Sequence, residues 1–124
     1  MKNILTYSSI VLLFFLSSFI SVDEVVSAIK NGSASQLSKF FDNTIEITVS
    51  DKSNTYSKSQ AELVLKDFFE NNVVKNFEVL HKEDKAATQF IVGTLITNNG
   101  AYKTTIYLKQ KGTKQLLQEL RFEK

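Results

Sequence analysis

The stretch SKSQAELVLKDFF, residues 57–69, decides how the rest of this chain must be arranged. Its apolar residues recur three and four positions apart, as they do on one face of a helix. These residues are Ala61, Val64, Leu65, Phe68 and Phe69. Ser57 and Gln60 match a capping box, in which the serine side chain accepts a hydrogen bond from a backbone N–H of the first turn. The pattern predicts one long amphipathic helix over residues 58–71.

Beyond this helix the hydrophobic pattern changes to an alternation with a period of two, which is typical of half-buried strands. The predicted strands are residues 77–82, 88–97, 101–110 and 114–122. Asn99–Gly100 is a hairpin signal, and Lys111–Gly112–Thr113 indicates another turn. The second half of the chain is therefore expected to form a meander of antiparallel strands.

The strand at 88–97 is apolar on both faces, with Phe90 and Val92 on one side and Ile91 and Leu95 on the other. One face can meet the helices. The other face must meet a partner, a second subunit or a ligand, or remain a partly exposed apolar patch.

The chain before the long helix predicts two short helices and a short strand pair. Val22, Val25, Val26 and Ile29 line one helical face. Asn31–Gly32 ends that helix, and Ser33 with Gln36 caps a second one, which carries Leu37, Phe40 and Phe41. Residues 45–49 read as a strand with which Thr55–Tyr56 can pair. Helices followed by a strand meander indicate an α+β layer structure.

Residues 1–21 have the layout of a secretory signal. Lys2 precedes the compact apolar run 10–16, and several serines dilute the stretch too much for a spanning helix. We expect cleavage near Ser21, with an uncleaved N-terminal anchor as the alternative, and only that alternative involves a membrane. The domain proper is then residues 22–124, periplasmic or secreted, and it is not a lipoprotein because the chain has no cysteine.

Composition sets wide limits on what this domain can be. The chain has 124 residues, 43% of them hydrophobic and 23% charged, so it forms one domain with a real core. The absence of cysteine excludes disulfides, thiolate metal sites and thiol nucleophiles. Residues 101–124 carry a basic excess, which we interpret as lysines that protect strand surfaces and not as a nucleic-acid interface.

Several runs of sequence resemble a family of small secreted bacterial proteins. The runs are Ala28–Gly32, Leu37–Phe41, Tyr56–Glu62, Leu65–Phe69, Ile91–Leu95 and Leu116–Arg121. They are similar to the domain of unknown function 4783 family, in the nuclear transport factor 2-like (cystatin-like) superfamily. The resemblance implies a curved antiparallel sheet of four to six strands wrapped around a long helix, with two short helices at the start. It implies no activity, so no catalytic residue is carried over.

Few residues suit catalysis or metal binding. His81 is the only histidine, so a zinc site is not expected, and the four glycines lie too far apart for a phosphate-cradling loop. No cofactor is predicted. His81 could act as a general base in a pocket, because it alternates with Phe77 and Val79, or it could be a solvated residue at a strand end.

Five polar or aromatic side chains are candidates for lining an apolar pocket. They are Tyr56, His81, Tyr102, Tyr107 and Arg121. Binding pockets are mainly apolar with a few placed polar groups. Tyrosine and arginine on a sheet are equally often packing groups with a solvated tip.

The sequence favours a non-catalytic binding module whose ligand is a small apolar molecule, a peptide or a partner protein, with self-association into a homodimer through the outer sheet face. One alternative is an isomerase-like or dehydratase-like enzyme that uses His81 with a tyrosine in the cavity of the cone. Another is a structural envelope protein whose cone is plugged by its own phenylalanines.

Overall fold

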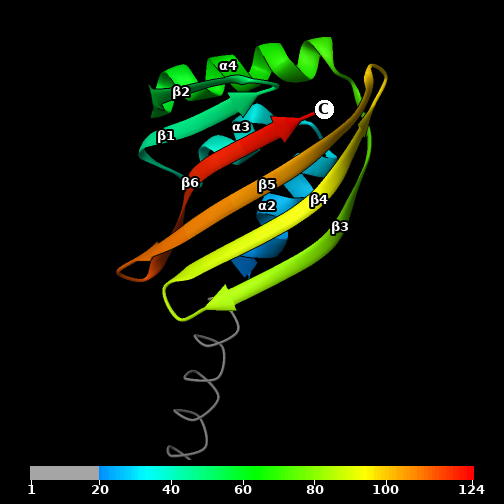
Figure 1. The fold of residues 1–124 in the computed structure, drawn as a ribbon. Coiled ribbons are helices and arrows are strands. Elements are labelled where there is room, and N and C mark those ends of the chain that lie inside the picture. Colours follow the sequence, from blue (N-terminus) through cyan, green and yellow to red (C-terminus); the bar gives the residue numbers. More distant parts are fainter. Residues whose placement is uncertain (1–19) are drawn as a thin grey trace, which may run out of the picture.

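The computed structural model describes residues 20–124, in which three helices lie beside one six-stranded sheet (Figure 1). The helices are α2 (Ile20–Lys30), α3 (Ala34–Ser38) and α4 (Lys58–Asn71). The strands are β1 (Phe41–Val49), β2 (Lys52–Ser57), β3 (Val74–Lys85), β4 (Thr88–Thr97), β5 (Gly100–Lys111) and β6 (Lys114–Glu123). The predicted signal sequence, residues 1–21, lies outside the described residues except for its last two positions, where α2 begins.

The strand order in the sheet is β2-β1-β6-β5-β4-β3. Strands β3 to β6 form the predicted antiparallel meander, and β1 and β2 form an antiparallel hairpin that contains the expected pairing of Thr55–Tyr56 with the first strand. β1 pairs with β6 in parallel, which the alternating pattern did not predict. Parallel neighbours need a long crossover. Here the whole chain from β2 to β5 provides it.

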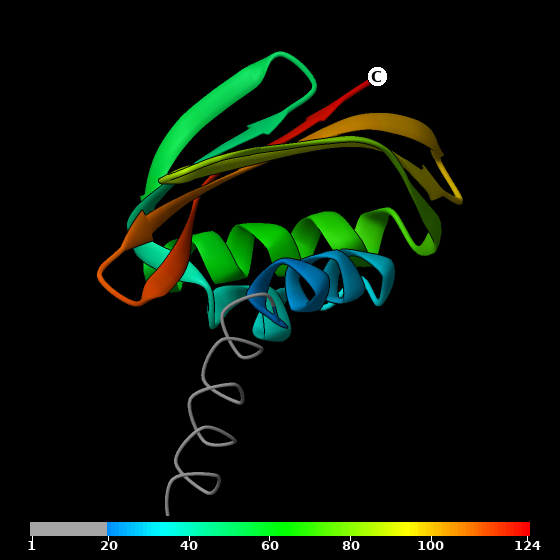
Figure 2. The ribbon, with the colours of Figure 1, turned by 90° about the horizontal axis from the view of Figure 1, so that it is seen from below.

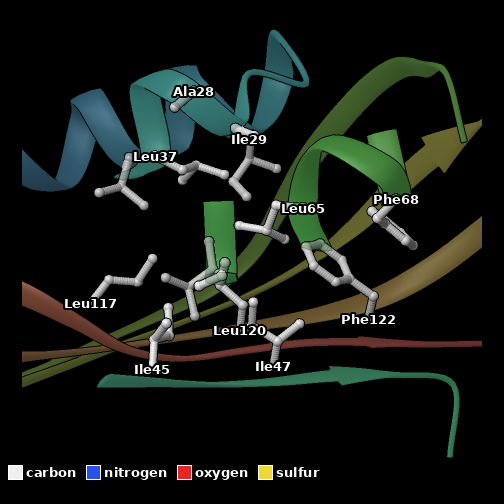
Figure 3. Packing of buried hydrophobic residues seen from close by; sticks show 14 of the residues in the cluster. Ala28, Ile29, Leu37, Ile45, Ile47, Leu65, Phe68, Leu117, Leu120 and Phe122 are labelled. Atoms are coloured by element: carbon white, nitrogen blue, oxygen red, sulfur yellow. The ribbon is translucent and has the colours of Figure 1, made fainter. Parts of the chain in front are cut away.

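All three helices cover the same face of the curved sheet (Figure 2). The stripe of α4 packs onto this concave face, where Leu65 and Phe68 lie close to Phe122 (Figure 3). The rings of Phe68 and Phe122 stack with centroids 4.4 Å apart, and Phe69 and Tyr102 meet Phe68 edge-on. Burial of these large apolar side chains is the main force that holds the two layers together.

The two faces of β4 divide as predicted. Ile91 and Leu95 are buried beneath the helices, whereas Phe90 and Ile96 remain 38% and 37% exposed on the outer face. An antiparallel sheet with one face in the core and one in solvent shows this alternation. The outer face of β4 therefore presents partly exposed apolar side chains, and no element among residues 20–124 covers it.

The helix ends follow the local signals in the sequence. The Ser33 and Ser57 hydroxyls accept hydrogen bonds from the backbone N–H groups of Gln36 and Gln60. Gly32 has a φ of 59°, the left-handed geometry that ends α2 and that glycine adopts without steric cost. The helix predicted over residues 58–71 is confirmed at both ends.

The second helix is shorter than its apolar pattern suggested. It ends at Ser38, and Phe41 is the first residue of β1. The expectation that Phe40 and Phe41 form its aromatic end was wrong. The backbone N–H of Leu117 donates to the carbonyl oxygen of Phe40 at 2.6 Å, so pairing with β6 takes these residues out of the helix.

A bulge in β3 overturns the expected orientation of His81. Val79 pairs with Gly93 of β4 and His81 pairs with Val92, so Leu80 is an extra residue between them. Gly93 is buried on the helix side and Val92 lies on the opposite side. His81 therefore does not share the inward face of Phe77 and Val79, and its side chain is exposed.

Candidate functional site

A groove with a volume of about 360 Å³ lies between the β1–β2 hairpin and α4. We call it the hairpin–helix groove. Its residues are Ile47, Val49, Lys52, Asn54, Tyr56, Val64, Asp67, Phe68, Asn71 and Asn72. Figure 2 shows the hairpin diverging from α4 towards its tip.

Strand register places one side of the hairpin over the groove. Ile45 pairs with Tyr56, and Ile47 pairs with Asn54, so the side chains of these four residues share the helix-facing side of β1 and β2. From α4, Val64 and Phe68 face the same space because they are four positions apart on one stripe. Apolar groups from the strands and the helix therefore form the floor of the groove.

Polar groups at the end of α4 line one end of the groove. Asn71 donates a hydrogen bond from Nδ2 to the carbonyl oxygen of Asp67 at 2.9 Å. Asn72 is buried and donates from Nδ2 to the carbonyl oxygen of Phe68, also at 2.9 Å. The Tyr102 hydroxyl donates to Oδ1 of Asn72 at 2.8 Å. Both ends of the Asn72 amide are satisfied, so its orientation is fixed.

The structure brings two of the five candidate residues to this groove. Tyr56 lines it directly, and Tyr102 lies behind it and holds Asn72 in place. Val64 and Phe68 were predicted only as part of the apolar stripe of the helix, and Asn72 was not predicted as a site residue. The one signal for Asn72 was its position directly after the apolar stripe, where an amide side chain can satisfy a carbonyl at the end of a helix.

The other three candidates lie elsewhere. His81 is on β3, at the sheet edge opposite β2. The ring of Tyr107 packs against Phe90 with centroids 4.6 Å apart. Arg121 is exposed and its Nε lies 3.6 Å from Glu119 and 3.4 Å from Glu123. The five residues therefore do not form a single pocket.

Two carboxyl groups outside the groove have shifted pKa values. The pKa of Asp42 is lowered to about 2 by a hydrogen bond from Lys111, by another from Gln118, and by the backbone N–H of Asn43. On the outer face, burial raises the pKa of Glu119, and the neighbouring charge of Glu46 raises it further. Asp42 thus links β1 to Lys111 of β5 and Gln118 of β6. Glu119 lies close to another acidic residue, Glu46.

Within residues 20–124, no three acidic or histidine side chains gather closely enough to hold a metal ion. None of the described helices is long and apolar enough to cross a membrane. The side chains that line the groove offer a ligand apolar surface, amide groups, one lysine and one aspartate.

The model of the family described as "Domain of unknown function (DUF4783)" matches residues 22–123. The chain belongs to the DUF4783 family. The curved sheet over a long helix, preceded by short helices, is thus the fold that the resemblance implied. No protein matched in the comparison with curated proteins.

Solved structures support the same assignment. A DUF4783 protein from Bacteroides ovatus is 30% identical, with a TM-score of 0.79, and the match covers 82% of this chain and 92% of that one. A DUF4783 protein from Bacteroides fragilis is 29% identical, with a TM-score of 0.78 and coverage of 82% and 95%. A nuclear transport factor 2-like protein from Cytophaga hutchinsonii is 8% identical, with a TM-score of 0.59 and coverage of 82% and 83%, and shows likeness of fold alone.

Proposed function

We propose that this DUF4783 chain is an exported, non-catalytic binding module and that its ligand occupies the hairpin–helix groove. The observation that carries the proposal is the composition of the groove. Val49, Val64 and Tyr56 offer half-buried apolar surface, and Asn72 stands at one end with its amide fixed by two hydrogen bonds. An apolar surface with a few oriented polar groups is the usual make-up of a binding site.

The position of His81 supports a non-catalytic role. Acid–base enzymes need a titratable group within hydrogen-bond reach of the reacting atom. The single histidine of the chain lies on β3, at the other edge of the sheet from the groove. Asp67 and Lys52 are the charged groups of the groove, and both are exposed. Such groups suit recognition of a polar ligand group better than proton transfer in a desolvated site.

The phenylalanine packing expected of a purely structural envelope protein is present, but it leaves the hairpin–helix groove unfilled. Phe68, Phe69, Phe122 and Tyr102 fill the space between the sheet and the end of α4. The hairpin–helix groove borders this cluster, because Phe68 belongs to both. The groove, and not the packed centre of the fold, is therefore the feature that supports a binding role.

Saturable binding of the neutral apolar dye Nile red tests the proposal. We expect its fluorescence to rise with a single dissociation constant on the folded domain, residues 22–124. Val64→Gln fills the groove with a polar side chain and should weaken binding by about tenfold, a change of about 1.4 kcal/mol. Leu63→Gln is the matched control, because Leu63 is the neighbouring residue on α4, is 65% exposed and does not line the groove.

Two results would contradict this assignment. One is the absence of saturable dye binding to the folded protein. The other is equal weakening by Val64→Gln and Leu63→Gln. Circular dichroism melting curves of both variants establish that each is folded at the temperature of the titration.

A further inference from the structure

The two edges of the sheet are not protected to the same degree. The order of strands places β2 at one edge and β3 at the other. β3 is interrupted by register shifts between Val74 and Asn76 and between Val79 and His81, and its last four residues, 82–85, are all charged. Bulges and charges are the features by which proteins prevent another chain from pairing with an edge. The β3 edge is therefore protected.

The β2 edge is much less protected. Its six residues, KSNTYS, contain no proline and a single charge, at Lys52. Its register with β1 runs without interruption from Val49–Lys52 to Thr44–Ser57. Every residue of β2 is exposed except Tyr56, which is half-buried. The strand is accessible and regularly paired with β1, and is therefore suited to pairing with another strand.

The turn geometry identifies which backbone groups of β2 are free. Only Ser50 and Asp51 connect the two strands, so the flanking pair Val49–Lys52 exchanges hydrogen bonds. Hydrogen-bonded pairs alternate with non-hydrogen-bonded pairs along an antiparallel ladder. It follows that Ser53 and Thr55 direct their N–H and C=O groups away from β1.

The hairpin–helix groove lies beside this same edge. Lys52, Asn54 and Tyr56 of β2 point towards the helices and line the groove, and alternate with the two residues whose backbone is free. A strand added next to β2 would place every second side chain on the groove side, because side chains alternate across a sheet. One bound segment could then use the backbone edge and the apolar groove together.

We propose that the ligand of the groove is an extended peptide that pairs with β2 as a seventh strand of the sheet and inserts apolar side chains between the hairpin and α4. This inference rests on the proposed function, because it names the ligand class of the same groove. Main-chain hydrogen bonds to Ser53 and Thr55 supply sequence-independent affinity. Contacts with Val64 and Phe68 supply selectivity for apolar residues at alternate positions.

Selection from a random linear decapeptide library displayed on phage, followed by synthesis of the enriched peptides, tests the inference. The measured quantity is the dissociation constant of each peptide by fluorescence anisotropy. Thr55→Pro removes the outward N–H but leaves the hydrogen bonds to β1 in place, and should weaken binding by about tenfold or more. Thr55→Ala is the matched control and should bind as the wild type does.

Hydrogen exchange gives a second measurement that does not depend on a variant. Binding of a selected peptide should slow exchange of the Ser53 and Thr55 amides by about tenfold or more, because both become hydrogen-bonded. The amide of Asn54 already pairs with β1 and should change less. N-methylation of alternate peptide bonds in the ligand should abolish binding in one register and spare it in the other.

The outcomes separate this inference from the proposed function. Peptide binding that is lost in Val64→Gln but kept in Thr55→Pro would overturn strand addition and leave the groove as the binding site. Failure to enrich any peptide, with Nile red still bound in the groove, would overturn the peptide class alone. A wild-type dimer that Thr55→Pro makes monomeric by light scattering would show that a second copy pairs with β2, and this would also overturn the proposal.

Discussion

The hydroxyl of Tyr102 donates a hydrogen bond of 2.8 Å to Oδ1 of Asn72, thirty positions earlier in the chain. Both residues are buried. The bond joins β5 to the C-terminal end of α4, and Asn72 in turn lines the hairpin–helix groove. The same contact thus connects the helix to the sheet and fixes a polar group of the candidate site.

Removal of this hydroxyl should cost stability. Tyr102→Phe leaves Oδ1 of Asn72 buried without a donor, and we expect the free energy of unfolding to fall by about 1–3 kcal/mol. Urea denaturation followed by circular dichroism measures the change. Tyr107→Phe removes a hydroxyl from the outer face and should alter stability by less than about 0.5 kcal/mol. Equal losses in the two variants would show that the Tyr102–Asn72 bond has no special role.

Gly93 should not tolerate even a methyl group. A Cβ at this position would lie 2.5 Å from the carbonyl oxygen of Glu78 and 2.7 Å from the ring of Phe77, so the strands β3 and β4 would have to move apart. We expect Gly93→Ala to destabilise the domain by about 1–3 kcal/mol. Thr94→Ala, at the next position of β4 and on the other face, is the control. A Gly93→Ala variant as stable as the wild type would contradict the close approach.

The lowered pKa of Asp42 predicts a specific acid sensitivity. Its carboxylate accepts hydrogen bonds from Lys111 and Gln118, and these hold its pKa near 2 in the folded state against 3.8 in the unfolded chain. A lowered folded pKa stabilises the fold above pH 3.8, and this stabilisation is lost as the pH falls from about 4 to about 2. Urea midpoints measured between pH 2 and 5 should therefore decline less steeply for Asp42→Asn than for the wild type. Parallel curves would contradict the assignment.

We also propose that the outer face of the sheet mediates self-association, as its exposed Phe90 and Ile96 suggest. Phe90→Glu puts a charge on this apolar surface and should raise the dissociation constant of a dimer by about tenfold or more. Sedimentation velocity over a range of concentrations measures this. Leu63→Glu is the control, because it adds the same charge to an exposed apolar residue of α4. A wild-type protein that stays monomeric at the highest concentration would contradict self-association.

Local pattern accounts for the features that sequence analysis predicted well. The bounds of α4 and β4 follow from periodicity and capping, which depend on residues within one or two turns of each other. The placement of Ile91 and Leu95 on one face of β4, opposite Phe90, likewise follows from alternation along a single strand. These signals arise from hydrophobic burial on one face of an element, so they can be read without knowledge of its neighbours.

The candidate site was predicted less completely because its parts come together only in the folded chain. Tyr56 and Val64 belong to different elements, and nothing near either residue in the sequence indicates that they face one groove. Tyr107 and Arg121 have side chains of a type that often lines pockets. They lie on the outer face of the sheet, however, and so point away from the groove. The type of side chain alone could not distinguish residues that line the groove from residues on the outer face of the sheet.

The amino-acid sequence alone specifies the order of helices and strands, the bounds of α4 and the face of α4 that is buried. Contacts between distant segments set the parallel pairing of β1 with β6, the bulge at Leu80 that turns His81 outward, and the position of β2 as a free edge beside the groove. The physical reason is the range of the interactions. Helix capping and hydrophobic periodicity act over a few residues, whereas strand pairing and bulges depend on hydrogen bonds between segments far apart in the chain.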